Sequence, residues 1–116
     1  MTSRSQSSPS PSGTSCSVVI VGRMGASITD RVLPSGDALT VFTVVVDRPR
    51  DHHAGAATVD ALPCQAFRAS VRTAVARLEA GQLVEVTGTL RRRFWRGPVG
   101  LGSALEVDVG RIRAVR

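Results

Sequence analysis

The sequence is poor in several residue types that often build functional sites. It contains no lysine and no tyrosine, one tryptophan, three phenylalanines and two cysteines. Cys16 and Cys64 form no CxxC pair and no set with histidine at zinc-ligand spacing, so we expect no structural zinc. Both thiols are expected to be reduced and to lie in or near the core. No apolar run approaches the ~20 residues of a membrane span, and we expect no membrane partner.

The N-terminal region also lacks the features of a targeting or folded segment. Its first fifteen residues contain seven serines, two prolines and no acidic residue, and they show no signal-peptide pattern. Such a composition cannot bury enough apolar surface to fold. We therefore expect residues 1–15 to be a disordered tail and residues 16–116 to form one domain of a cytoplasmic protein.

Positive charge is in clear excess. All fifteen basic residues are arginines, and nine acidic residues leave a net charge of +6. This excess favours a polyanionic partner. A coding bias toward arginine explains the missing lysine, but it does not explain why four arginines cluster within residues 91–96.

Alternating apolar residues predict five strands, and a helical spacing predicts one helix. The strands are expected at residues 16–23, 39–47, 58–67, within 81–97, and at 105–112. A helix of about ten residues is expected after the third strand, with Ser70 as its N-cap and Gly81 ending it. Residues 24–36 are expected to form a loop with a short extended piece at 29–33, residues 48–57 a long hairpin loop, and residues 97–100 a turn.

The order of these elements predicts the fold class. Three strands, a short helix and two strands form the all-β, five-stranded Greek-key barrel called the OB-fold, with the helix between strands 3 and 4 covering one end. In the last strand, Leu105, Val107 and Val109 are expected to point inward.

The strand at 39–47 is apolar on both faces, which a curved barrel strand or a subunit interface would explain. Phe42 is expected in the core. Val44 and Val46 are expected outside the barrel, where an apolar stripe is a hazard unless another subunit covers it. The strand therefore favours a homo-oligomer.

Residues 91–96 carry the candidate binding chemistry. Guanidinium groups hold phosphates by charge and paired hydrogen bonds, and flat aromatic rings stack on unpaired bases. The adjacent Phe94 and Trp95 lie among the clustered arginines. This combination indicates a single-stranded nucleic acid as the ligand.

Six blocks of the sequence, in order, resemble a known family. They are residues 18–23, 33–38, 42–48, 60–67, 81–95 and 105–107, and the fifth contains the pattern Gly-x-x-Val-x-Val-x-Gly-x-Leu-Arg-x-Arg-x-Trp. The set resembles the bacterial single-stranded DNA-binding protein family, in a short actinobacterial-type form without the acidic C-terminal tail. The resemblance covers residues 16–113.

The resemblance implies single-stranded DNA binding without sequence preference and without catalysis, in DNA replication, repair and recombination. It implies a nucleoid-associated homotetramer built from dimers, with no cofactor, no metal and no small-molecule substrate. The family's stacking aromatics carry over to Trp95 and Phe67. Beside them we expect Phe94 to help in stacking, and Arg91, Arg93 and Arg96, aided by Arg48 and Arg50, to bind phosphates.

The sequence departs from the family pattern at two tryptophan positions, which fall near Arg50 and on Ala61. Because one base–aromatic stack contributes ~1–3 kcal/mol, we expect affinity per subunit to be reduced or to depend more on electrostatics. The family's glycine-rich tail with an acidic, Phe-terminated tip is also missing. That tip recruits other enzymes in the family, so we expect no hub role through such a tail.

Several alternatives remain open for these residues. Arg91 and Arg93 could form cross-strand ion pairs with Glu106 or Asp108. Phe67 and Trp95 could pack in the core. The whole domain could be an accessory OB-fold module that works by protein contact, with weak DNA or RNA binding.

A metal-dependent nuclease is the enzyme alternative. Its candidate residues are Asp47, Asp51, His52, His53 and Asp60. These acids lie mostly on a loop, and adjacent histidines alone rarely offer a suitable metal geometry. We therefore expect neither a metal site there nor an enzyme.

Overall fold

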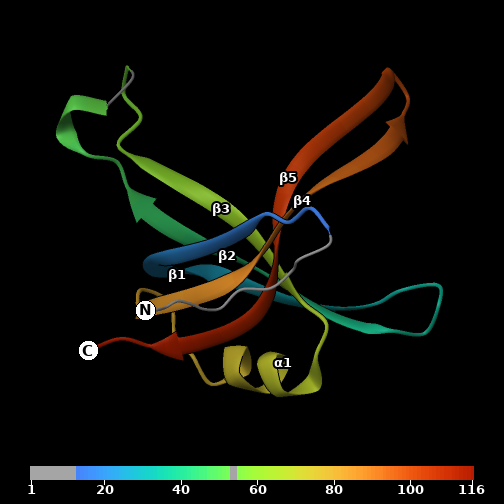
Figure 1. The fold of residues 1–116 in the computed structure, drawn as a ribbon, viewed down its shortest axis with the longest axis horizontal. Helices are drawn as coiled ribbons and strands as arrows, with labels where there is room; N and C mark the ends of the chain where they lie inside the picture. Colours follow the sequence, from blue (N-terminus) through green and yellow to red (C-terminus); the bar gives the residue numbers. More distant parts are fainter. Residues whose placement is uncertain (1–12, 53–54) are drawn as a thin grey trace.

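The computed structural model describes residues 13–52 and 55–116, within which five strands close into a barrel (Figure 1). The elements in chain order are β1 (Ser17–Val32), β2 (Ala38–Asp47), the short 3-10 helix η2 (Arg50–His52), β3 (Val59–Ala66), α1 (Ala69–Ala76), β4 (Leu83–Gly97) and β5 (Gly100–Ala114). The strand order around the barrel is β1-β2-β3-β5-β4. This confirms the predicted OB-fold with its helix between β3 and β4. Of the predicted disordered tail, residues 1–12 lie outside the described residues.

β1 continues well beyond its predicted end at Arg23. Its first half pairs with β4, and its second half pairs with β2 as far as Val32. Between Met24 and Ile28 the register with β2 shifts, which marks a β-bulge. The predicted loop is therefore wrong over residues 24–28, because the bulge interrupts the apolar alternation without ending the strand. The extended piece predicted at residues 29–33 is confirmed as far as Val32, as part of the same strand.

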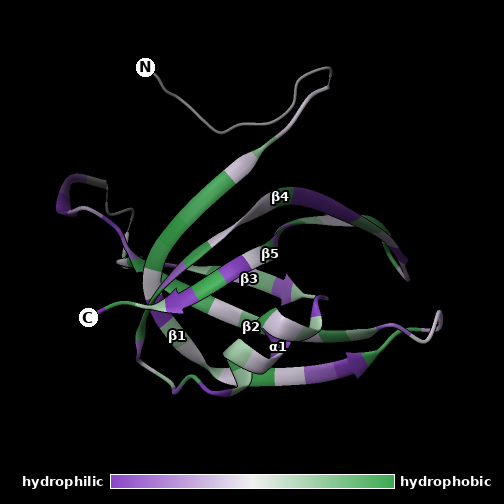
Figure 2. Cartoon of the chain, turned by 60° about the horizontal axis from the view of Figure 1, so that its bottom comes forward, coloured by the Kyte–Doolittle hydropathy of each residue, from purple (hydrophilic) through white to green (hydrophobic). Residues whose placement is uncertain are grey.

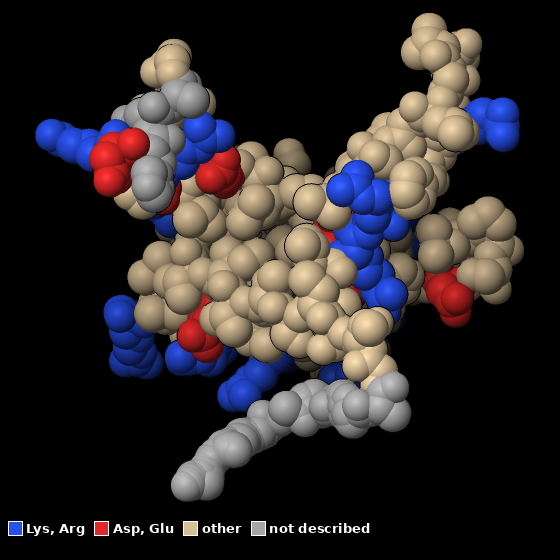
Figure 3. Space-filling model, turned by 45° about the horizontal axis from the view of Figure 1, so that its top comes forward, with Lys and Arg blue, Asp and Glu red and all other residues tan. Residues whose placement is uncertain are grey.

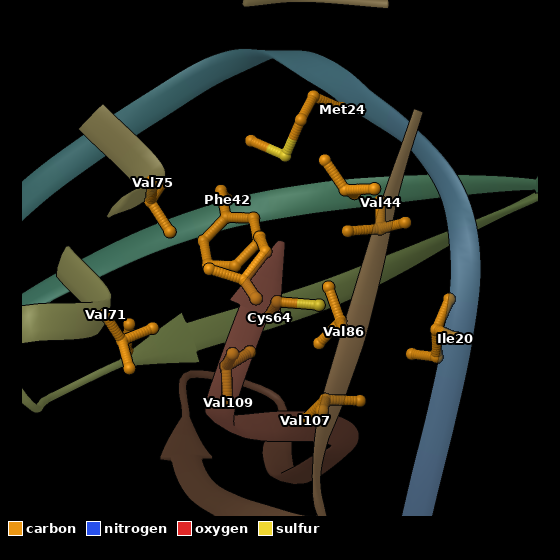
Figure 4. Packing of buried hydrophobic residues seen from close by; sticks show 13 residues of the cluster. Ile20, Met24, Phe42, Val44, Cys64, Val71, Val75, Val86, Val107 and Val109 are labelled. Atoms are coloured by element: carbon orange, nitrogen blue, oxygen red, sulfur yellow. The ribbon is translucent and has the colours of Figure 1, made fainter. Parts of the chain in front are cut away.

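The barrel interior is filled mainly by valine side chains around Phe42 (Figure 4). The buried cluster consists of Ile20, Met24, Phe42, Val44, Cys64, Ala66, Val71, Val75, Val84, Val86, Val107, Val109 and Ile112. Val71 and Val75 come from α1, so the helix covers one end of the barrel as predicted. The core position of Phe42 is also confirmed.

β2 turns the face that carries Phe42, Val44 and Val46 inward. Val44 is fully buried in the barrel, and Val46 packs against the same cluster. The expectation that these two valines lie outside is therefore wrong. Alternation separates the two faces of a strand but does not say which face is inside. The outer row of β2 consists of Val41, Thr43 and Val45, which remain partly exposed.

α1 begins and ends earlier than predicted. Arg68 occupies the N-cap position without a side-chain cap hydrogen bond, so Ser70 is not the N-cap, and the helix has eight residues. Gly81 lies in the turn before β4 with a φ of 85°, and its N–H donates to the carbonyl of Met24 at 2.8 Å. It shapes the entry into β4 instead of ending the helix. Within residues 13–52 and 55–116, no helix has the length and apolarity that a membrane crossing requires.

The two cysteines occupy different environments. Cys64 is buried, and burial raises the pKa of its thiol to about 12. Cys16 is exposed just before β1. The prediction that both thiols lie in or near the core is therefore wrong for Cys16.

β4 and β5 extend beyond the barrel as a hairpin, and we call residues 91–106 the β4–β5 arm (Figures 1 and 2). The predicted turn is confirmed, with Gly97 opposite Gly100, and strand pairing begins directly there. β3 joins β5 no earlier than Val107, so the arm has no third strand beside it. Leu105, predicted to point inward, lies on the arm and is 47% exposed.

Candidate nucleic-acid interface

The arm presents two faces, because successive residues of a strand point to opposite sides. One continues the outer surface of the barrel, and we call it the groove face; the other we call the far face. On β4 the groove face carries Arg91, Arg93 and Trp95, and the far face carries Arg92, Phe94 and Arg96. The predicted site residues of the arm are thus divided between two surfaces. The structure does not bring Phe94 to the side of Trp95.

A groove of about 330 Å³ lies between the base of the arm and the outer side of β2 and β3. It is lined by Arg31, Leu33, Leu39, Val41, Gln65, Phe67, Arg93 and Glu106. Phe67 directly follows β3 and is 43% exposed, so it forms a wall of the groove and is not a core residue. The groove therefore unites Phe67 and Arg93, two predicted site residues that are distant in sequence.

Trp95 is held against the arm and not in the barrel core. It is 42% exposed. A Cβ atom built on Gly102, directly opposite on β5, would come within 2.6 Å of indole atoms Cε2 and Cζ2, so the ring packs on bare backbone. The guanidinium carbon of Arg93 lies 5.0 Å from the ring centroid, within cation–π range. The ring is thus supported yet accessible for stacking.

Both arginines of the groove face form ion pairs with β5, which confirms the cross-strand alternative. Arg93 Nε lies 3.0 Å from Glu106 Oε1. Arg91 pairs with one carboxylate oxygen of Asp108, and the other accepts a hydrogen bond from Gln65. The Arg91 and Arg93 side chains remain 62% and 55% exposed. The carboxylates of Asp108 and Glu106 are only 24% and 13% exposed, so the pairs hold the arginines in place while the exposed guanidinium atoms stay accessible to a phosphate.

The predicted phosphate contacts on the β2–β3 loop lie away from the groove. Arg48 pairs with Asp60, with 2.8 Å between Nη2 and Oδ1, and Arg50 is exposed in η2. Figure 1 shows the loop and the arm as two separate projections on the same side of the barrel. Basic side chains form a band along the arm and mix with acidic ones on the loop (Figure 3). Arg48 and Arg50 therefore belong to a second basic projection.

Two acidic residues of the nuclease alternative, Asp47 and Asp60, are engaged by arginines. Asp47 accepts hydrogen bonds from Arg23 at 2.8 and 2.9 Å, and this bonding, together with the positive charge, lowers the pKa of Asp47. Asp60 pairs with Arg48. Among the described side chains, which exclude those of His52 and His53, no three metal-ligating groups lie close enough to hold an ion. The geometry gives the nuclease alternative no support.

The sequence reasoning missed five residues that line the groove, namely Arg31, Leu33, Leu39, Val41 and Gln65. Leu39 and Val41 could have been found from the sequence, because β2 is apolar on both faces and an apolar outer face indicates a contact surface. Arg31 and Leu33 fell in the segment interpreted as a loop. Nothing in the sequence pattern placed them beside Phe67.

The comparisons with known proteins concern the family and the fold of the chain. Residues 16–115 match the family model described as the single-strand binding protein family. The chain is 34% identical over 85 residues to a single-stranded DNA-binding protein of Thermotoga maritima, covering 72% of this chain and 60% of that protein. It is 31% identical over 83 residues to single-stranded DNA-binding protein 3 of Listeria innocua, covering 72% of this chain and 52% of that protein. The match therefore spans only about half to three fifths of these relatives.

Solved structures with the same fold include a Plasmodium falciparum SSB in complex with single-stranded DNA. Its TM-score is 0.68 at 17% identity, covering 91% of this chain and 97% of that one. A mitochondrial single-stranded DNA-binding protein from S. cerevisiae has a TM-score of 0.70 at 16% identity, covering 90% and 98%. At these identities the likeness establishes the fold. With the closed β1-β2-β3-β5-β4 barrel and the match over residues 16–115, the chain belongs to the single-strand binding protein family.

Proposed function

We propose that the protein binds single-stranded DNA without sequence preference and without catalysis, along the groove and the groove face of the arm. The observation that carries the proposal is the placement of two exposed aromatic rings, Phe67 at the groove wall and Trp95 on the arm. Arg93 lines the same groove and lies over the Trp95 ring. The names of the similar bacterial proteins describe the same ligand.

The aromatic and basic residues have different roles in binding. Phe67 and Trp95 stack on bases, at ~1–3 kcal/mol for each stack, and tolerate any sequence because every base has a flat face. Arg91 and Arg93 contact phosphates through the guanidinium atoms that their ion pairs leave exposed. The β2–β3 loop carries Arg48 and Arg50, which extend the basic surface for a longer strand.

We also propose a cellular role in DNA replication, repair and recombination, in the cytoplasm at the nucleoid, and assembly into a homotetramer built from dimers. The outer surface of the barrel supports assembly. Val19 and Val21 on the outer side of β1 are 65% and 50% exposed, and the outer row of β2 adds further valines. An exposed apolar surface of this kind marks a contact site, and a second copy of the chain would remove it from water.

An accessory module that works by protein contact is the second candidate. Two points favour it: both groove-face arginines are ion-paired, and the resemblance to the family places Ala61 where a stacking tryptophan is expected. Each reduces the contribution that one subunit can make to DNA binding. The two candidates differ in whether the isolated protein binds a single strand at low salt.

Intrinsic fluorescence separates the two candidates, because Trp95 is the only tryptophan. Titration with oligo-dT at low salt is expected to quench the emission to saturation, and competition with oligo-U measures the preference for DNA over RNA. Unchanged emission, together with no retardation of a labelled strand in a gel, would favour the accessory module. Incubation of the labelled strand with Mg²⁺ or Mn²⁺ is expected to leave it intact.

Trp95→Ala provides the direct test of stacking. The variant is expected to bind a labelled oligo-dT ~1–3 kcal/mol more weakly in fluorescence anisotropy, because one stack is lost. Its Tm should stay close to that of the wild type, since Trp95 lies outside the core. A large loss of Tm with unchanged binding would assign Trp95 to stability.

A further inference from the structure

The far face of the arm is an exposed surface that the groove does not use. On β4 it carries Arg92, Phe94 and Arg96, and directly opposite on β5 lie Leu105, Ser103 and Leu101. All six residues are exposed, and Phe94 is 68% exposed. An aromatic ring therefore stands between two arginines on one strand, with apolar and hydroxyl side chains beside it.

The two faces differ in their charge balance. On the groove face, both arginines pair with carboxylates of β5. On the far face, Arg92 Nη1 donates to Ser103 Oγ at 3.1 Å, and within the described residues neither Arg92 nor Arg96 has an ion-pair partner. The uncompensated positive charge of the arm thus lies on the far face, and this is the side that attracts a polyanion.

We propose that the far face is a second contact surface for single-stranded DNA, on which Phe94 stacks on a base and Arg92 and Arg96 contact the flanking phosphates. The proposal rests on the proposed function. Arg92 and Arg96 are four residues apart, ~14 Å at ~3.4 Å per residue of strand, with the ring midway between them. Stacking rings combined with backbone-tracking cations are what single-stranded nucleic acids require.

Other occupants fit this face less well. A second copy of the chain that met it through the same face would bring four arginines together about a two-fold axis, which like-charge repulsion opposes. The N-terminal residues 1–12 contain Arg4 and no acidic residue, so their sequence offers no partner to the arginines either. The phosphates of a single strand neutralise the two arginines, and one of its bases stacks on the Phe94 ring.

A single strand can reach both faces by passing the tip of the arm. The turn between Gly97 and Gly100 closes the arm just beyond Trp95, and Val99 at the tip is fully exposed. The arm is only two strands wide there, and neighbouring strands lie ~4.8 Å apart. A short oligonucleotide therefore fills the groove and the groove face, whereas a longer one continues round the tip to Phe94.

The test compares short and long oligo-dT on the wild type and on the variant Arg92→Gln/Phe94→Ser/Arg96→Gln. The short probe has roughly eight nucleotides, within the 4–16 nucleotides that one OB-fold occupies, and the long probe is roughly three times longer. We expect the variant to lose at least about fivefold in affinity for the long probe, as the loss of one stack requires. Affinity for the short probe should stay within about twofold.

The double variant Arg77→Gln/Arg116→Gln is the control for net charge. It removes two exposed arginines that lie outside the arm.

Single substitutions on β5 give a matched pair that leaves the far-face side chains of β4 in place. Ser103 lies opposite Phe94 on the far face, and Ala104 lies opposite Arg93 on the groove face. A carboxylate at either position repels phosphates and pairs with the local arginines. We expect Ser103→Glu to weaken only the long probe and Ala104→Glu to weaken both probes.

The outcomes separate this proposal from the function on which it rests. Unchanged long-probe affinity in both far-face variants overturns the second surface and leaves groove binding intact. Equal losses for both probes also overturn it, because the far face would then be part of the first site. A changed mass in light scattering with unchanged DNA binding would make the far face a protein contact. If the wild type binds neither probe, the proposed function fails and the second surface fails with it.

Discussion

Trp95 packs directly on Gly102 across the β4–β5 arm. A Cβ atom at position 102 would come within 2.6 Å of indole Cε2 and Cζ2 and within 2.8 Å of Nε1, closer than real Cβ contacts come. Any side chain at this position must therefore displace the ring. Because the arm has no third strand beside it, the position of the indole depends on this contact and on Arg93.

Gly102→Ala is accordingly expected to weaken single-strand binding by up to ~1–3 kcal/mol, the contribution of one stack. The stability of the barrel should hardly change, because the core is not touched. Oligo-dT titration and thermal unfolding measure the two effects. Gly97→Ala is the matched control, since a Cβ there would lie at an ordinary 3.6 Å from the Gly100 carbonyl oxygen. Equal binding by Gly102→Ala and the wild type would contradict the role given to Trp95.

The salt dependence of binding is expected to flatten when Arg91 and Arg93 are both changed to alanine. Each phosphate contact to a single strand contributes a slope of about −0.7 to log K against log salt. Arg113→Ala is the control, because Arg113 is also ion-paired, with Glu85 at 2.8 Å, but lies away from the arm. If the double substitution leaves this slope unchanged, the two arginines form ion pairs within the protein and do not contact phosphates.

Glu106→Gln is expected to act in the opposite direction. It removes the negative charge that holds Arg93, whose Nε lies 3.0 Å from the Glu106 carboxylate. The freed guanidinium should raise affinity for oligo-dT at low salt by a few fold, since its full charge becomes available to a phosphate. Weaker binding by Glu106→Gln would show that the carboxylate positions Arg93 and does not compete with DNA.

The order of the strands along the chain was predictable because most strands show the expected alternation of apolar residues. Residues 83–90 alternate between apolar and mostly polar positions, and the core-facing Val84 and Val86 are fully buried. β1 was predicted too short because the bulge after Met24 breaks the alternation, and a bulge is fixed by the pairing with β2. Long-range pairing of this kind leaves no local signal in the sequence.

The site was predicted in its residue types but not in its geometry. The turn at residues 97–100 was recognised, and it already sets the hairpin register that places Trp95 opposite Gly102 and Arg91 opposite Glu106. Strand alternation alone would have separated Phe94 from Trp95. The groove could not be predicted, because it combines Phe67 with the end of β1 and the segment after it, where the sequence predicted only a short extended piece within a loop.

The two cysteines are expected to differ in reactivity. Burial raises the pKa of Cys64 to about 12, so near neutral pH almost none of it is the thiolate that reacts. A thiol reagent is therefore expected to modify Cys16 alone in the folded protein and both residues after denaturation. Cys16→Ser should show no modification until it is unfolded. Rapid labelling of folded Cys16→Ser protein would contradict the burial of Cys64.

Assembly is expected to use the outer surface of β1 and β2. Val19 and Val21 lie on this surface and are largely exposed, opposite Thr87 and Glu85 of β4. Val44, which the sequence pattern placed outside, is fully buried in the barrel and contributes nothing to an interface. The apolar surface available to another subunit is therefore centred on β1.

Val21→Asp is expected to lower the mass that light scattering measures at micromolar protein, because assembly would bury an unpaired carboxylate. Val99→Asp, the same substitution at the fully exposed tip of the arm, should keep the wild-type mass. Loss of assembly should also remove most of the gain in affinity with oligo-dT length, since linked sites raise effective concentration only while the subunits stay together. A monodisperse wild-type monomer, or an affinity that ignores strand length beyond about a dozen nucleotides, would contradict the tetramer and favour the accessory module.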